Sequence, residues 1–230
     1  MGRLLAALLL AVLAVLGAAA ARPQPVDLQL ILAVDASGSV DSEEWRLQMQ
    51  GYVDAFRDPR VHAAIQGGEH QAIAVTFVQW SGYLLQRRMT PWTRLDGPAA
   101  ANAYAETLAA MPRTIFGGGT SLSGIIDYGV AEFGRSPHAA ERRILDISGD
   151  GRNVTGPPAP PARDRAVAQG ITINGLPILG SEIALDDWYE ANVIGGFGSF
   201  MIAADGFESF GRAILAKLIR EIALLPEDAR

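Results

Sequence analysis

Two short and almost unbroken apolar segments constrain the fold of this chain most strongly. They span residues 28–34 and 72–78, and polar or glycine-containing residues bound each of them. A strand exposed on one face alternates apolar and polar residues, whereas a strand covered on both faces is apolar throughout. We therefore expect two central parallel strands in a sheet that carries helices on both faces.

The rest of the chain alternates between helical and strand patterns. Apolar residues recur at helical spacing behind Asp41 and Glu44, which have the spacing of a capping box. Residues 84–90 are expected to return as an antiparallel edge strand with Arg87 and Arg88 facing solvent. Further strands are expected at 144–148, 171–176 and 200–203, and further helices at 98–111, 121–133, 162–169, 184–192 and 207–225. This order predicts an α/β fold of the Rossmann-like kind, with a doubly wound, mostly parallel six-stranded sheet, one antiparallel edge strand and helices on both faces.

The N-terminal segment is typical of a secretory signal peptide. Arg3 precedes an apolar run over 4–16 and a small-residue stretch over 17–21. The run is shorter than the roughly 20 residues that a membrane-spanning helix needs, so we expect cleavage, with an uncleaved anchor as the alternative. The expected organisation is a signal peptide at 1–21, a short linker at 22–26, one domain at 27–226 and a tail at 227–230. The mature chain is expected to be secreted or periplasmic, without a membrane span.

Composition excludes several classes of site and partner. The absence of cysteine excludes disulfides, a thiolate zinc site and a cysteine nucleophile. The formal net charge is −6 and no run of basic residues occurs, which argues against nucleic acid and anionic membrane surfaces as partners. Lys217 is the only lysine.

Oxygen-bearing side chains gather in a loop directly after the first predicted strand. Asp35, Ser37 and Ser39 alternate along this loop, and Gly38 permits the chain to curl so that the three side chains reach one point. In doubly wound sheets, ligands bind at the carboxyl ends of the strands, which is where this loop lies. A helix-capping loop is the alternative, because Asp and Ser also satisfy free amides at a helix start.

Two further turns carry the same kind of side chain. Thr120 follows three glycines before a helical pattern, and Asp150 lies between two glycines after a strand. Read alone, the first fits an N-cap or a phosphate cradle and the second a tight turn. Together the three loops supply two carboxylates and three hydroxyls on one side of the sheet. Ligation by oxygen alone selects Mg²⁺ or Mn²⁺, or Ca²⁺, over zinc and copper.

These three loops resemble the metal-ion-dependent adhesion site of von Willebrand factor A-type domains. All five positions match: Asp35, Ser37, Ser39, Thr120 and Asp150. The resemblance extends over about residues 26–225, and 147–151 and 188–196 are similar to a group of bacterial secreted proteins with this fold. It implies one bound divalent cation, with Mg²⁺ as the expected ion. It also implies an open coordination position that accepts an Asp or Glu side chain from a partner protein.

The expected function is therefore cation-dependent binding of an extracytoplasmic protein, with no catalytic residue. Trp80 and Tyr83, at a strand turn on the metal side, are candidate partner contacts, with core packing as the alternative. A metal-dependent hydrolase or phosphotransferase is a second hypothesis. A phosphatase of the haloacid dehalogenase type would have an aspartate where Ser37 stands, and the sequence has neither a P-loop nor a GxSxG elbow. A subunit in which the metal only stabilises the fold is the third hypothesis.

Overall fold

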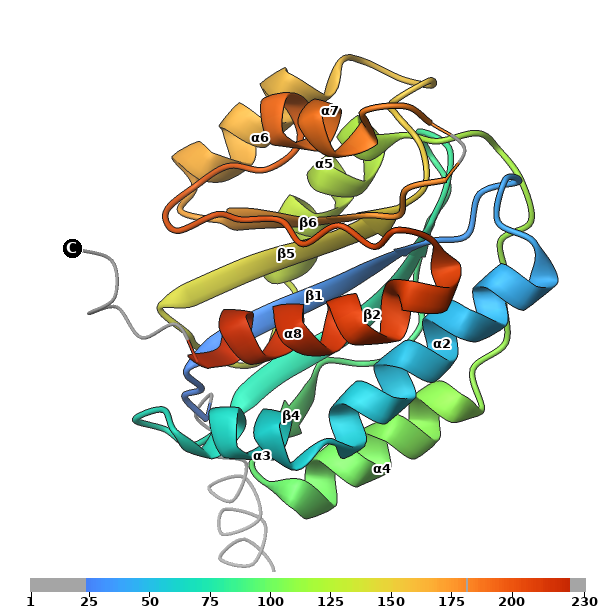
Figure 1. The fold of residues 1–230 in the computed structure, drawn as a ribbon. Helices are drawn as coiled ribbons and strands as arrows, with labels where there is room; N and C mark the ends of the chain where they lie inside the picture. Colours follow the sequence, from blue (N-terminus) through green and yellow to red (C-terminus); the bar gives the residue numbers. More distant parts are fainter. Residues whose placement is uncertain (1–23, 181, 224–230) are drawn as a thin grey trace, which may run out of the picture.

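A computed structural model describes residues 24–180 and 182–223 (Figure 1). The predicted signal peptide, the first two residues of the predicted linker and the predicted C-terminal tail lie outside these residues. Within them, no helix combines the length and the apolar character that crossing a bilayer requires.

The fold is built on one mixed sheet of six strands. From one side of the sheet to the other, the parallel strands are β2 (Ile73–Trp80), β1 (Leu28–Asp35), β5 (Arg142–Gly149) and β6 (Thr172–Pro177). All eight residues of β1 and of β2 are buried, as the apolar runs predict. The predicted class, a doubly wound and mostly parallel α/β sheet, is confirmed.

The antiparallel edge differs in detail from the prediction. It consists of two short strands, β3 (Gln86–Arg88) and β4 (Thr93–Leu95), which both pair with β2. The edge is interrupted at Thr90, whose hydroxyl accepts a hydrogen bond from Phe77 N at 2.9 Å, and at Pro91, which has no N–H to donate. Side-chain bonding thus replaces the backbone ladder over these residues.

Two other segments also depart from the prediction. Residues 200–203 form no strand: Met201 makes one isolated bridge to Gly175 of β6, and Ala204 makes another to Ile178. Pro177 at the end of β6 has no N–H for a regular ladder. A short helix, α3 (Pro59–Gln66), was not predicted. Asp58 caps it by accepting from Arg60 N, and Pro59 occupies its first turn.

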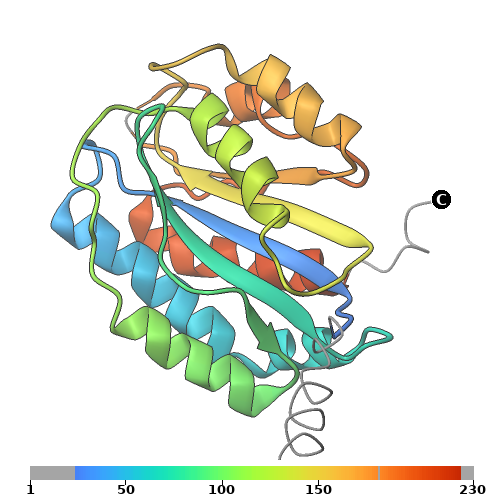
Figure 2. The same cartoon turned by 180° about the vertical axis from the view of Figure 1, so that it is seen from behind.

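Helices cover both faces of the sheet (Figures 1 and 2). One face carries α2 (Ser42–Arg57), α3, α4 (Pro98–Ala109) and α8 (Phe210–Ala223), the last preceded by a 3-10 turn at Phe207–Ser209. The other face carries α5 (Leu122–Phe133), α6 (Ala159–Ala168) and α7 (Leu185–Asn192). The two hydrophobic cores therefore lie on opposite sides of the sheet.

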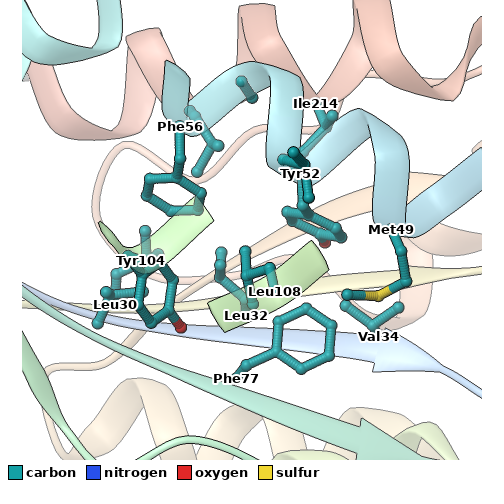
Figure 3. Close-up of a cluster of buried hydrophobic side chains, with 14 of the residues drawn as sticks. Leu30, Leu32, Val34, Met49, Tyr52, Phe56, Phe77, Tyr104, Leu108 and Ile214 are labelled. Atoms are coloured by element: carbon teal, nitrogen blue, oxygen red, sulfur yellow. The ribbon is translucent and has the colours of Figure 1, made fainter. Parts of the chain in front are cut away.

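The larger core fixes α2 against the centre of the sheet (Figure 3). Phe56 meets Tyr104 edge to face with ring centroids 5.0 Å apart, and Tyr52 meets Phe77 at 5.5 Å. The start of α2 has the predicted capping box, because Asp41 Oδ1 accepts from Glu44 N while Glu44 Oε2 accepts from Asp41 N. Packing and capping together define where the loop between β1 and α2 begins and ends.

Candidate metal centre

The candidate site lies where β1 and β5 end side by side. The two strands are parallel neighbours, and Val34 pairs with Ser148. Both strands therefore end at the same level of the sheet. The strand order also reverses here, because β2 lies on one side of β1 and β5 on the other. Such a reversal opens a crevice at the carboxyl edge of a doubly wound sheet.

Hydrogen bonds connect the first loop to Asp150. Ser37 N donates to Asp35 Oδ1 at 2.7 Å, and the hydroxyl oxygens of Ser37 and Ser39 lie 3.0 Å apart. Ser39 Oγ donates to Asp150 Oδ1 at 2.9 Å. Hydrogen bonds therefore link four of the five predicted residues in one chain of contacts.

The glycine-rich turn brings Thr120 to the same place. Gly117, Gly118 and Gly119 all have positive φ, at 125°, 98° and 70°, a conformation that favours glycine. The carbonyl of Thr120 accepts from Val154 N at 2.9 Å, which ties this turn to the loop that follows Asp150. The Thr120 hydroxyl oxygen faces Gly151, 3.4 Å from where a Cβ would stand. All five predicted residues thus meet at one edge of the sheet.

The electrostatics of the two carboxylates suit a divalent cation. Asp35 is completely buried, and among the described residues its Oδ2 has no hydrogen-bond partner. Burial, and then the charge of Asp150, raise the pKa of Asp35 to about 7. Burial also raises the pKa of Asp150. A cation would offset both effects, and exposed Ser39 gives it access from solvent. The donor set therefore fits a hard divalent ion.

Three residues near the site were not found from the sequence. Arg113 donates to the carbonyl oxygens of Val40, Ala36 and Ser37 at 2.7, 3.0 and 2.8 Å, so it holds the first loop from beneath.

Gly149 and Tyr189 are the other two. A Cβ on Gly149 would stand 2.9 Å from Asp35 Oδ2 and 2.9 Å from the Tyr189 hydroxyl oxygen. That hydroxyl is buried and has no hydrogen-bond partner among the described residues. Asp35 and Tyr189 therefore both border a position that only glycine fills without displacing a neighbour.

The candidate partner contacts separate into one buried and one exposed residue. Trp80 is 0% exposed, so its assignment as a surface contact is wrong. It pairs with Asp35 in the sheet and is covered on both sides, as core strand residues are. Tyr83 is 38% exposed in the turn between β2 and β3.

Clusters of three or more His, Asp or Glu residues with metal-binding geometry do not occur within residues 24–180 and 182–223. The sheet and its helices have the fold of von Willebrand factor A-type domains.

A family comparison extends this assignment. The chain belongs to the family described as "Protein of unknown function (DUF1194)", whose profile matches residues 25–226. No curated protein matches the sequence.

Solved structures with the same fold include proteins from very different sources. A proximal thread matrix protein 1 from the mussel byssus, with a zinc-occupied MIDAS motif, is 14% identical, with a TM-score of 0.66 over 88% of this chain and 50% of that chain. A von Willebrand factor type A protein from Catenulispora acidiphila is 17% identical, with a TM-score of 0.57 over 86% and 43%.

A third structure is the pilus adhesin SpaC from Lactobacillus rhamnosus GG, which is 15% identical with a TM-score of 0.59 over 87% of this chain and 31% of that chain. This chain therefore spans half the length of these relatives or less. At these identities the likeness shows the fold.

Proposed function

We propose that this domain binds one divalent cation, with Mg²⁺ as the expected ion. The ligands are Asp35, Ser37, Ser39, Thr120 and Asp150. The cation then captures an Asp or Glu side chain of an extracytoplasmic partner protein. Three of the five ligands are neutral hydroxyls, so the bound ion keeps much of its charge and attracts an incoming carboxylate strongly. In this role the domain is a binding module for adhesion or assembly, and residues 1–21 direct its export.

One observation carries the proposal. Asp35 is fully buried, and its Oδ2 has no hydrogen-bond partner among the described residues. Hydrogen bonds also connect Asp35 through Ser37 and Ser39 to Asp150. A buried carboxylate oxygen without a partner is costly unless a positive group satisfies it. A cation at this place supplies that group.

Exposed apolar side chains around the site support a protein partner. Leu84 is 83% exposed, Phe116 is 76% exposed and Val154 is 66% exposed. Leu84 lies on the turn after β2, Phe116 directly before the triple glycine that precedes Thr120, and Val154 on the loop after Asp150. Phe116 and Val154 are thus on loops that carry residues of the metal site. Exposed apolar residues that gather on one face are typical of interaction surfaces. Tyr83, on the first of these loops, is a further contact in this proposal.

The structural relatives also favour binding over catalysis. They are named as a matrix protein and a pilus adhesin, and the fold is shared with them. A screen for phosphatase and esterase activity in Mg²⁺ addresses the hydrolase hypothesis. Turnover that disappears in Asp35→Ala would favour that hypothesis instead.

Affinity capture from an extract of the source organism's envelope tests the proposal. The immobilised wild-type chain is expected to retain a protein in Mg²⁺ and to release it in EDTA. Asp150→Ala is expected to capture nothing although it folds, as shown by circular dichroism. Asp164→Ala, which removes an exposed carboxylate on α6, is the matched control and is expected to behave as wild type. Capture that persists in EDTA contradicts the proposal.

A further inference from the structure

A second group of ionisable side chains is buried between α8 and the centre of the sheet. Lys217 on α8 places Nζ 2.5 Å from Asp146 Oδ1 on β5 and 2.5 Å from Glu221 Oε1, one turn further along α8. All three residues are 0% exposed. Asn174 on β6 donates Nδ2 to Glu221 Oε1 at 2.8 Å, which orients that carboxyl group. One amine and two carboxyl groups thus meet in the interior of the protein.

The amine is chemically distinctive in this chain. Lys217 is the only lysine in the sequence, so every other residue among the 19 lysines and arginines is an arginine. A deprotonated primary amine is a nucleophile, whereas a guanidinium stays protonated and is not. The only primary amine among the side chains of this chain is therefore enclosed with two carboxyl groups.

Several oxygens of the two carboxyl groups lack hydrogen-bond partners among the described residues. Among the described residues, neither oxygen of Asp146 accepts a hydrogen bond, although Lys217 Nζ lies 2.5 Å from Oδ1. Glu221 Oε2 also has no hydrogen-bond partner there. Burial, and then the charge of Asp146, raise the pKa of Glu221, so this group favours its protonated form. Three ionisable groups are thus buried together, at a considerable desolvation cost.

We propose that Lys217 Nζ and Asp146 Cγ condense into an intramolecular amide bond, with Glu221 as the proton relay. A proton first passes from the Lys217 ammonium to the Asp146 carboxylate across their contact. The neutral amine then attacks Asp146 Cγ while Glu221 gives its proton to the oxygen that leaves. The attacking nitrogen returns a proton to Glu221 as the C–O bond breaks. The ammonium and carboxylate become one amide and one water, and Glu221 ends protonated as it began.

The interior favours each part of this reaction. A low-dielectric environment favours the neutral amine and acid over the separated charges. Fixed positions replace a bimolecular encounter, which is a large gain for two groups already in contact. The ring of Phe200, 5.8 Å from Lys217 Nζ, lies on the same cluster and helps exclude the water that hydrolysis would need. The product contains no buried charge and joins α8 covalently to the central sheet.

Peptide mass spectrometry of the full chain tests this proposal directly. The purified protein is denatured and digested with trypsin, which cleaves after Arg143, Arg152, Arg212 and Arg220 but not after an acylated lysine. We expect a branched species that joins peptide 144–152 to peptide 213–220, with the mass of one water less than their sum. Unmodified peptide 144–152 together with cleavage after Lys217, in protein kept folded for days, would overturn the proposal.

Two variants separate the relay from the fold. Glu221→Gln keeps the size of the side chain but cannot exchange a proton, so it is expected to fold, by circular dichroism, without the branched peptide. Glu106→Gln, an exposed change on α4, is the matched control and is expected to retain the branched peptide. A branched peptide in Glu221→Gln would overturn the relay role. The digest of the wild-type protein tests whether the amide bond forms, and this test does not depend on the folding of any variant.

Discussion

Arg113 offers the sharpest test of how the metal loop is held. Its guanidinium donates to Val40 O, Ala36 O and Ser37 O, all of which belong to the loop that carries three of the proposed ligands. Each such hydrogen bond is worth about 1 kcal/mol net, so Arg113→Ala removes about 3 kcal/mol of restraint from the loop. If half of this loss falls on the ligand arrangement, the population competent for binding falls about tenfold.

We therefore expect Arg113→Ala to weaken Mg²⁺ binding about tenfold and to lower the free energy of unfolding by about 1–3 kcal/mol. Isothermal titration of chelator-treated protein measures the first quantity, and urea unfolding measures the second. Arg87→Ala, which removes an exposed arginine of β3, is the matched control and is expected to change neither. A dissociation constant for Arg113→Ala within about twofold of wild type would refute this account of the loop.

Three further predictions concern the site and the core. Saturating Mg²⁺ is expected to raise the free energy of unfolding by about 2.7 kcal/mol at a hundredfold excess over its dissociation constant, and Asp150→Asn to abolish this gain in thermal unfolding; an equal gain in the variant contradicts the proposed site. Gly149→Ala is expected to weaken Mg²⁺ binding in a titration, because its Cβ would stand 2.9 Å from Asp35 Oδ2, whereas Gly134→Ala meets only ordinary contacts and is expected to leave binding unchanged. Phe56→Ala is expected to cost about 3–5 kcal/mol in urea unfolding, and a cost below about 1 kcal/mol would contradict its role in the core.

Local patterns were sufficient for the central sheet and for most helices. The apolar runs of β1 and β2 predict burial on both faces because no polar side chain interrupts them for long, and both strands are buried throughout. The capping box at Asp41 and Glu44 is equally local, since both partners lie within one turn. Features that depend on neighbours three or four residues away are visible in the sequence.

Features that depend on distant residues were not predictable in this way. Trp80 has the same local pattern whether it faces solvent or the core, and only the elements packed around it decide for the core. The bonds of Arg113 to the metal loop join residues more than 70 positions apart. Tyr189 on α7 likewise borders the same position at Gly149 as Asp35 on β1, more than 150 residues earlier.

The two edge differences have a common cause. Residues 84–90 and 200–203 have strand composition, but proline removes a backbone donor near each of them, Pro91 in the edge itself and Pro177 in the strand it would join. Strand composition therefore predicted where the chain runs along the sheet. It did not predict whether a regular ladder forms there.

Titration of Mg²⁺ into chelator-treated wild-type protein tests the central claim most directly. The account predicts one bound ion per chain, with binding lost in both Asp35→Ala and Asp150→Ala while circular dichroism shows that each variant folds. Wild-type protein that binds no divalent cation, or variants that bind it as tightly as wild type does, would contradict the claim that these residues form the metal centre.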